Sequence, residues 1–372
     1  MKRGLLFGAI ATLTGTIVGA GIFGLPYVVA QSGFVVGLLN IIILGVIMLF
    51  INLYLGEISL RTKGFHQITG YASKYLGKPG KILMLFSMIF GIYTALVAYM
   101  LGEGEVLSFI FFGSQSYTLW FSLAFFSVMF FLVSKSLKAL EEGESFGLIA
   151  VFTLIIIITL FFFPKLNTSN LAYISKPSMW FLPYGVTFFA FLAFSALPEI
   201  KQELKNNEKL MKKAILIGSL IPILLYIIFV TTVVGFSGKA TPEIATMVFG
   251  KLPCLLAVFT MFTAFFTLAS AIRDMYRFDF NFKKTKAWLL ACLVPLAVFI
   301  VISLFKAATF IQILSLSGSI SGGLAGILIV LMIKKAKKLG NRKPEYSIPI
   351  SWPIITILIA LFIFGMIYQF LF

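Results

Sequence analysis

The sequence predicts an all-α membrane protein of about eleven transmembrane helices, in which the first and the sixth helix are broken at membrane depth. Hydrophobic residues make up 60% of the 372 positions and charged residues only 12%, which is about half the charged share of soluble domains. Apolar runs long enough to cross a bilayer recur along the whole chain. Glycine, proline and small residues interrupt two of these runs, one in each half of the sequence.

Eleven apolar runs of membrane-spanning length are separated by polar loops. The predicted spans are Gly4–Ser32, Phe34–Leu60, Lys81–Phe112, Tyr117–Ser134, Ser145–Phe163, Trp180–Ile200, Lys213–Gly235, Pro253–Asp274, Ala287–Phe305, Thr309–Ile333 and Ile348–Phe372. The start, MKRGLLFGAI, is similar to a signal peptide, but no small-residue cleavage site follows it and the apolar run continues. It is therefore predicted to begin the first span.

The basic residues predict the orientation. With the N-terminus inside, all 30 Lys and Arg residues lie in inside segments except Lys165, Lys176, Lys239, Lys251 and Lys306. Such a bias predicts an integral protein of the plasma membrane with a cytoplasmic N-terminus and an outside C-terminus. The net charge of +17 then belongs to short loops that face anionic lipid headgroups, and it does not indicate nucleic-acid binding.

The first predicted break lies in the stretch TGTIVGAGIFGLPY at Thr14–Tyr27. An unbroken helix in lipid satisfies its own backbone, so it needs no such concentration of glycine and proline. Broken helices are tolerated where the freed backbone groups line a cavity, and secondary transporters bind substrates at such breaks. The alternative is a packing face on which Gly15 and Gly19 let a neighbouring helix approach closely.

The second predicted break lies in the sixth span, WFLPYGVTFFAFLAFSALPEI. Small residues between Ala190 and Ser195 leave room for an irregular turn, and Pro198 disfavours helical geometry at Leu197. An ordinary proline kink near a helix end is the alternative. The similar spacing of spans one to five and six to ten predicts two inverted five-helix repeats, 1–163 and 179–333, followed by an additional helix at 348–372.

Residues for catalysis or metal binding are scarce. Cys254 and Cys292 fall within spans, which indicates no disulfide framework, and His66, the single histidine, is predicted in a solvated inside loop. The chain has neither a G-x-S-x-G motif nor a Walker loop. The two breaks favour a transporter, with a passive channel and a membrane-embedded enzyme as the alternatives.

Four motifs carry a resemblance to a known family: TIVGAGIFGLPY at Thr16–Tyr27, GEISLRT at Gly56–Thr62, AFSALPEI at Ala193–Ile200 and IRDMYRFD at Ile272–Asp279. With them the chain resembles the amino acid/polyamine/organocation superfamily, and within it the aromatic and hydroxy amino acid permeases and the amino acid/auxin permeases. The resemblance implies a leucine-transporter-type fold, a five-plus-five inverted repeat whose first and sixth spans are broken. It also implies secondary active transport of an amino acid with H+ or Na+ by alternating access, without chemical transformation.

The resemblance also suggests where the substrate binds. If Val18–Phe23 is unwound, N–H groups at Gly19, Ala20, Gly21 and Ile22 would face the substrate carboxylate, because a helix N-terminus attracts anions. Carbonyl groups near Ile17 and Ala190–Phe191 would accept from its ammonium. The predicted side-chain pocket, which favours an apolar or aromatic substrate, is lined by Ala95, Tyr99, Phe188, Phe191 and Phe194. Core packing is the alternative for each phenylalanine, since the chain has 42 of them.

An ion site is suggested in the eighth span. Thr260, Thr263, Thr267 and Ser270 share one helical face. The fold implies a Na+ site between Thr263, Thr267 and the carbonyl groups of Gly15 and Val18, since hard cations prefer oxygen ligands. Ala264 stands where the family pattern has a second hydroxyl, and the seventh span has no Asn for a second Na+ site. The alternative is that these hydroxyls bond their own backbone. No other cofactor is predicted.

Charged residues inside spans suggest coupling and gating, because such charges are costly in a bilayer. Glu103 and Glu105 are candidate proton carriers, with an interfacial position as the alternative. Glu57 is a weaker candidate, because a helix-surface pair with Arg61 four residues later explains it. By fold analogy, Asp274 and Arg3 would pair to close the inner gate. The predicted partners are an amino acid, the coupling ion and membrane lipid, and no obligate protein partner is expected.

Overall fold

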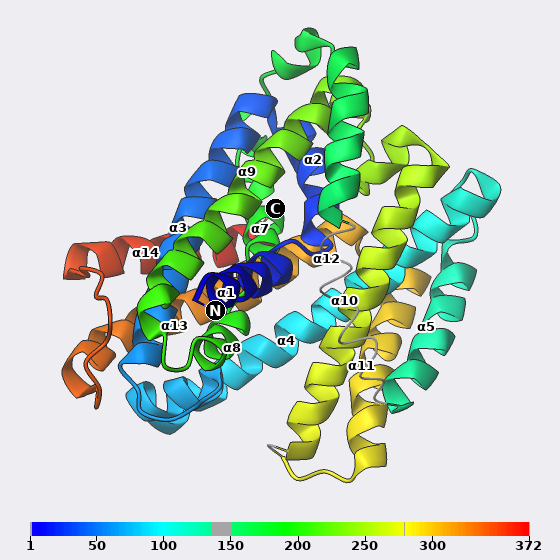
Figure 1. Ribbon diagram of the computed structural model, residues 1–372. Coiled ribbons are helices and arrows are strands. Elements are labelled where there is room, and N and C mark those ends of the chain that lie inside the picture. Colours follow the sequence, from blue (N-terminus) through cyan, green and yellow to red (C-terminus); the bar gives the residue numbers. More distant parts are fainter. Residues whose placement is uncertain (1, 136–150, 279, 372) are drawn as a thin grey trace.

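The computed structural model describes residues 2–135, 151–278 and 280–371 (Figure 1). Its named elements in these ranges are all helical, and one isolated β-bridge joins Gly33 to Ile174. The prediction of an all-α membrane fold is therefore confirmed. The helices are α1 (Lys2–Ile17), α2 (Gly21–Ser32), α3 (Phe34–Leu60), α4 (Ile68–Phe112), α5 (Thr118–Lys135), an unlabelled helix at Val151–Lys165, α7 (Pro183–Ala190), α8 (Ala196–Glu203), α9 (Met211–Ser237), α10 (Lys251–Phe278), α11 (Lys284–Phe305), α12 (Phe310–Leu316), α13 (Gly323–Leu339) and α14 (Trp352–Leu371).

The predicted spans can be matched to these helices. Across the described residues, eight helices are long and apolar enough to cross a membrane, and the bent pair α1–α2 makes a ninth span. The other two predicted spans correspond to the shorter helix Val151–Lys165 and to the pair α7 and α8. The predicted start of the fifth span, Ser145, lies outside the described residues. The division into two inverted repeats stays a prediction.

The α4 helix differs from its predicted span, because it begins at Ile68 rather than Lys81. Its first part was predicted as an inside loop. Gly77 lies within it at φ 74° and separates a short helix from the membrane-spanning part. This positive φ favours glycine, which has no Cβ to clash, and Pro79 follows directly after the kink. Gly77 and Pro79 therefore mark a bend inside a helical segment that was predicted as an inside loop.

The broken helices lie in the middle of the bundle (Figure 1). α1 packs against α9 and α8, and α2 packs against α7 and α9. On one side of this centre α4 packs with α5 and α10, and α11 joins them. On the other side α13 packs with α14 and α3. Both breaks therefore lie inside a layer of surrounding helices, away from lipid.

A π-helical turn at Ser317–Gly322 joins α12 to α13 and holds α7 in place. A Cβ added to Gly318 would lie 2.0 Å from the Gly185 carbonyl oxygen of α7, so only glycine permits this approach. On the α4 side, the hydroxyl groups of Ser87 and Ser321 each donate to the other residue's carbonyl, at 2.7 and 2.8 Å. The turn thus fixes α7 and α4 relative to each other.

The two ends of the bundle are packed differently. At the predicted outer end, α2 packs against the 3-10 turn Ala245–Phe249 and against α12. Nearby, the Glu243 carboxylate accepts the Ile311 N–H at 3.1 Å, and burial raises the pKa of Glu243. At the predicted inner end, α1 packs on α8 and α9 but makes few close contacts with α4 or α10. Most of α2 is buried, whereas much of α1 is partly or fully exposed, so the packing around α1 is the looser.

Candidate functional site

The first break consists of residues 18–20, between the end of α1 and the start of α2, where the axis bends by 54°. The Ala20 and Gly21 N–H groups have no hydrogen-bond partner among the described residues. The Ile22 N–H donates to the Gly19 carbonyl at 3.3 Å and the Phe23 N–H to Ala20 at 3.1 Å. The predicted unwound segment Val18–Phe23 was therefore too long, and two of the predicted amides, Ala20 and Gly21, are free.

These two amides lie at the N-terminus of α2, where the helix dipole favours an anion. Gly21 also faces the second broken helix at very short range. A Cβ on Gly21 would lie 2.8 Å from the Ala190 Cα and 3.2 Å from the Phe189 ring. Glycine is needed here because it allows the two breaks to meet.

The second break consists of residues 191–195, between α7 and α8. The predicted small-residue segment Ala190–Ser195 is thus the interrupted one. Pro198, however, lies in the first turn of α8, and Leu197 is helical. The predicted distortion at Leu197 is wrong, because a proline in the first turn removes an N–H that has no helical partner there. The break therefore precedes the proline by several residues.

Tyr226 of α9 connects the two breaks. Its hydroxyl lies 2.7 Å from the Ile17 carbonyl oxygen and 2.9 Å from the Ala190 carbonyl oxygen. These are the last residues of α1 and α7, and both carbonyls were predicted to accept from a substrate ammonium. The Tyr226 side chain is fully buried, and its ring contacts Phe191 with centroids 5.1 Å apart.

The three predicted pocket phenylalanines lie in different surroundings. Phe188 contacts Tyr184 and Phe362 of α14, so its ring is directed toward α14. Phe191 packs between Tyr226 and α3, where its ring tip would lie 3.0 Å from a Cβ on Gly45. Both placements correct the predicted pocket. Phe194 lies in the second break and is partly exposed, and Phe189 is the α7 ring beside Gly21.

A stripe of α4 residues carries the remaining pocket candidates. Ala95, Tyr99 and Glu103 are spaced by four and therefore share one helical face. All three are buried. Glu103 has 0% exposure, and neither of its carboxylate oxygens has a hydrogen-bond partner in the described ranges. Glu105 is on another face and is partly exposed.

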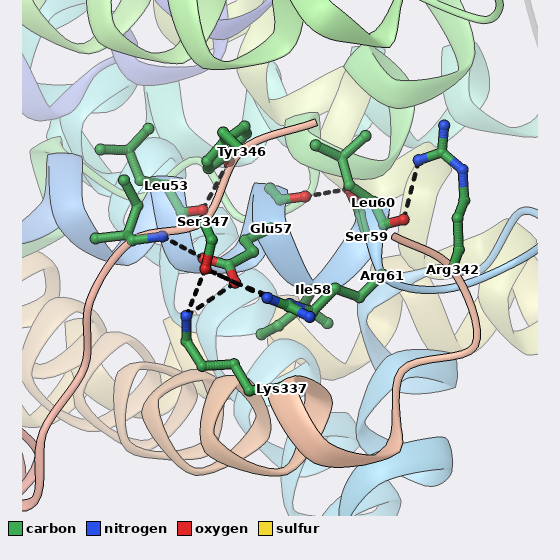
Figure 2. A network of polar contacts seen from close by, with 12 residues as sticks. Leu53, Glu57, Ile58, Ser59, Leu60, Arg61, Lys337, Arg342, Tyr346 and Ser347 are labelled. Carbon is green, nitrogen blue, oxygen red and sulfur yellow. Dashed lines mark hydrogen bonds and ion pairs between the residues drawn. The ribbon is translucent and has the colours of Figure 1, made fainter. Parts of the chain in front are cut away.

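Glu57 has the opposite environment (Figure 2). Its buried carboxylate accepts from Arg61 at 2.8 Å, from Lys337 and Ser347 at 3.0 Å each, and from the Ile348 N–H at 2.7 Å. Arg61 and Lys337 therefore balance its charge. The predicted pair with Arg61 is present, and the other contacts come from the end of α13 and the connection to α14. Glu57 is therefore held in place by four donors, two of which are cationic.

The α10 hydroxyls show both predicted alternatives. Thr263 donates to the carbonyls of Phe259 at 3.0 Å and Thr260 at 3.1 Å, while Thr267 is partly exposed on the same face. In α1, the Gly19 N–H bonds Ile17 rather than Gly15, so the Gly15 carbonyl lacks its helical donor. The Na+ site between these oxygens and that of Val18 stays a prediction, and Ala264 leaves it one ligand fewer. Within the described residues, no three His, Cys, Asp or Glu side chains are grouped to hold a metal ion.

The predicted gate pair of Arg3 and Asp274 is not formed. Asp274 is paired with its neighbour Arg273 at 2.9 Å, and Arg3 is exposed. The helix that carries Arg3 is instead tied to α8 and α9, because Thr12 donates to Glu203 at 2.8 Å and Thr14 donates to the Gly218 carbonyl at 3.2 Å. The separation of Arg3 from Asp274 agrees with the loose packing of α1 at this end.

A protein-family comparison decides the relationship. The model described as the tryptophan/tyrosine permease family matches residues 2–241, which include both breaks and Tyr226. The chain belongs to the tryptophan/tyrosine permease family. The amino acid permease relationship suggested by the four motifs is therefore confirmed.

Relatives of this permease are named as amino acid transporters. It is 26% identical to glutamine transporter 2 of Aliivibrio fischeri over 62% of the chain and 61% of that protein. It is 25% identical to tyrosine-specific transport system 1 of Haemophilus influenzae over 89% of the chain and 88% of that protein. In structure it is similar to MhsT in complex with L-phenylalanine, with a TM-score of 0.68 and 16% identity over 98% of the chain and 97% of MhsT. This likeness confirms the leucine-transporter-type fold.

Two residues of the permease site were missed from the sequence. Tyr226 lies in the seventh predicted span, four residues after Pro222, and neither residue was singled out from the sequence. Phe189 was passed over in favour of Phe188, one position away. A tyrosine hydroxyl at membrane depth needs a partner, and that requirement was the available signal for Tyr226.

Proposed function

We propose that this permease moves an amino acid with an apolar or aromatic side chain across the membrane by alternating access, coupled to H+. The observation that carries the proposal is the meeting of two broken helices at Gly21 and Ala190, with unpaired amides on one side and helix-end carbonyls on the other. Such breaks form substrate sites in secondary transporters.

In the proposed complex, the substrate carboxylate accepts from the Ala20 and Gly21 N–H groups at the start of α2. Its ammonium donates to the carbonyls of Ile17 and Ala190. Both charged groups of a zwitterion are then neutralised by backbone, and no side-chain carboxylate is needed for recognition. Phe189 and Phe194 are placed to contact the substrate side chain, which supports an apolar or aromatic ligand. Two relatives named as tyrosine-specific also support this class.

The coupling proton is assigned to Glu103. A carboxylate buried without a partner bears the full cost of desolvation, whereas the neutral acid does not. Glu103 lies one helical turn from Tyr99 on the face that carries the pocket candidates, so its protonation can respond to the occupied site. Glu57 is already paired with two cations, and Glu105 is partly exposed on another face. A Na+ ion at Gly15, Val18, Thr263 and Thr267 remains the second candidate for coupling.

The cycle follows from the packing difference between the two ends. With the N-terminus predicted to be cytoplasmic, we assign this arrangement to a carrier whose inner gate is open, because α1 makes few close contacts with α4 or α10. Closure would bring α1 toward α10, and Arg3 toward Asp274. Asp274 would then exchange its neighbour Arg273 for a partner across the gate.

The test is uptake of labelled L-tyrosine, L-phenylalanine and L-glutamine into proteoliposomes, with H+ and Na+ gradients imposed separately. We expect H+-driven accumulation of the aromatic amino acids. Accumulation driven only by a Na+ gradient would assign the coupling ion to the Na+ site at Thr263 instead of to Glu103. Failure to take up or exchange any amino acid under either gradient would refute the proposed function.

A further inference from the structure

Tyr226 is bonded at the place where the proposed substrate ammonium would bind. Its hydroxyl contacts the Ile17 carbonyl oxygen at 2.7 Å and the Ala190 carbonyl oxygen at 2.9 Å. Across the described part of the chain, no other side chain is hydrogen-bonded to either oxygen. Ile17 is the last helical residue before the first break, and Ala190 is the last helical residue before the second. One side chain on a third helix therefore links both breaks.

The numbers of donors and acceptors in this link do not match. A tyrosine hydroxyl has one proton to donate, whereas the two carbonyls present two acceptors at nearly equal distance. The Ile17 oxygen also accepts the Gly19 N–H at 2.9 Å, whereas the Ala190 oxygen has no other donor among the described residues. Sharing one hydroxyl proton therefore leaves the Ala190 oxygen incompletely satisfied, which is unfavourable for a buried group. A substrate ammonium carries three donors and a positive charge, so it can satisfy both carbonyls at once.

We propose that Tyr226 is a positioning residue that holds the two breaks together in the empty carrier and yields their carbonyls to the substrate ammonium in the loaded carrier. The inference rests on the proposed function, because it takes an amino acid as the ligand. When no substrate is bound, the Tyr226 hydroxyl donates to the carbonyls that would otherwise accept from the substrate ammonium. It therefore stabilises the empty site and lets the carrier return across the membrane without substrate.

Removing the hydroxyl has two opposite consequences. In the empty carrier, the Ala190 carbonyl loses its donor and the Ile17 carbonyl keeps only the Gly19 N–H, so this state becomes less favourable. In the loaded carrier, the ammonium still satisfies them, so the substrate binds more tightly relative to the empty state. Net uptake requires the empty carrier to return, whereas exchange of one substrate molecule for another does not. The two transport modes should therefore separate.

The experiment compares wild type and Tyr226→Phe in proteoliposomes with labelled L-tyrosine. Net uptake is measured into empty vesicles and exchange into vesicles preloaded with unlabelled L-tyrosine. We expect net uptake to fall about tenfold and exchange to stay within about twofold of wild type. The dissociation constant for L-tyrosine in detergent should fall about tenfold, which corresponds to about 1.4 kcal/mol.

Tyr184→Phe is the matched control. It removes the hydroxyl of a second buried tyrosine, which is on α7. This hydroxyl donates to the Leu361 carbonyl of α14 at 3.4 Å, away from both breaks. We expect both transport modes to be unchanged in this variant. Thermal unfolding in detergent establishes that each variant is folded.

Two outcomes would overturn the inference. The first is a folded Tyr226→Phe variant with wild-type net uptake, and the second is equal loss of net uptake and exchange, which indicates a purely structural bond. If the variant does not fold, 3-fluorotyrosine at position 226 gives a second test, because its fluorine resonance should shift when L-tyrosine is added. An unchanged resonance would also overturn it. Wild type that neither takes up nor exchanges L-tyrosine would contradict the proposed substrate class instead.

Discussion

Glu57 and Glu103 are both carboxylates with no exposed side-chain surface, yet their surroundings are opposite. Glu57 accepts four hydrogen bonds from Arg61, Lys337, Ser347 and the Ile348 backbone (Figure 2). Glu103 accepts none from the described residues. Around the first carboxylate, two cations and two neutral donors replace the water that burial removes. The second has no such replacement.

The difference separates a structural carboxylate from one that can change its charge. Around Glu57, the connection between α13 and α14 lies along α3. The Tyr346 hydroxyl donates to the Leu53 carbonyl at 2.7 Å, and the Arg342 guanidinium donates to the Leu60 carbonyl at 3.0 Å. Every one of these contacts opposes movement of the connection. Around Glu103 nothing holds the charge, so a proton can be gained or lost without breaking an existing bond.

The largest expected effect is the loss of proton coupling in Glu103→Gln. Glutamine has the shape of the neutral acid but cannot release a proton. Each pH unit of gradient is worth about 1.4 kcal/mol, so two units can sustain roughly 100-fold accumulation by wild type. The variant should only equilibrate labelled L-tyrosine while still exchanging it. Accumulation at the wild-type level would show that Glu103 does not carry the coupling proton.

The same substitution at Glu57 should instead act on stability. Glu57→Gln leaves Arg61 and Lys337 without a counter-charge and presents an N–H₂ group to donors. Breaking a buried ion pair typically costs about 3 kcal/mol or more, and we expect a loss of this size in the free energy of unfolding. Glu103→Gln is the matched control, since it should leave thermal unfolding in detergent unchanged. Equal unfolding temperatures for the two variants would show that Glu57 and Glu103 do not differ in their contribution to stability.

Sequence reasoning located both breaks because their causes are local. Glycine at 19 and 21 and the small residues from Ala190 to Ser195 act on the backbone where they stand, and their effects can be read at those positions. The exact limits were harder to predict. Proline at 198 marked the neighbourhood of the second break but is compatible with the first turn of α8, so the interruption lies before it.

The sequence predicted side-chain placement less well, because placement depends on helix phase and on distant segments. A shift of one residue at the end of α7 directs Phe189 toward Gly21 and Phe188 toward α14. The partners of Glu57 other than Arg61 come from residues about 280 positions away in sequence, such as Lys337. Tyr226 likewise meets Ile17 across 209 positions. No local pattern contains such contacts.

A smaller effect is expected when one Glu57 partner is removed. In Lys337→Met, the carboxylate keeps Arg61, Ser347 and the Ile348 N–H, and the Lys337 side chain is 24% exposed. We expect a loss of about 1 kcal/mol in unfolding free energy. In the double variant with Glu57→Gln, the loss in unfolding free energy should be smaller than the sum of the two single losses, since both substitutions disrupt the same contact. Additive losses in thermal unfolding would mean that Lys337 acts independently of Glu57.

The smallest expected effect is that of Thr263→Ala, which tests whether Glu103 alone accounts for coupling. The Thr263 hydroxyl already bonds the Phe259 and Thr260 carbonyls of its own helix, and Ala264 supplies no second hydroxyl at this turn. If H+ is the coupling ion, uptake of L-tyrosine should change by less than about twofold under an H+ gradient, because a hydroxyl bonded within its helix contributes little. Loss of Na+-driven uptake in this variant, together with normal accumulation by Glu103→Gln, would transfer coupling to the Na+ site. Glu103 would then be a neutral carboxylic acid buried in the core, without a role in coupling.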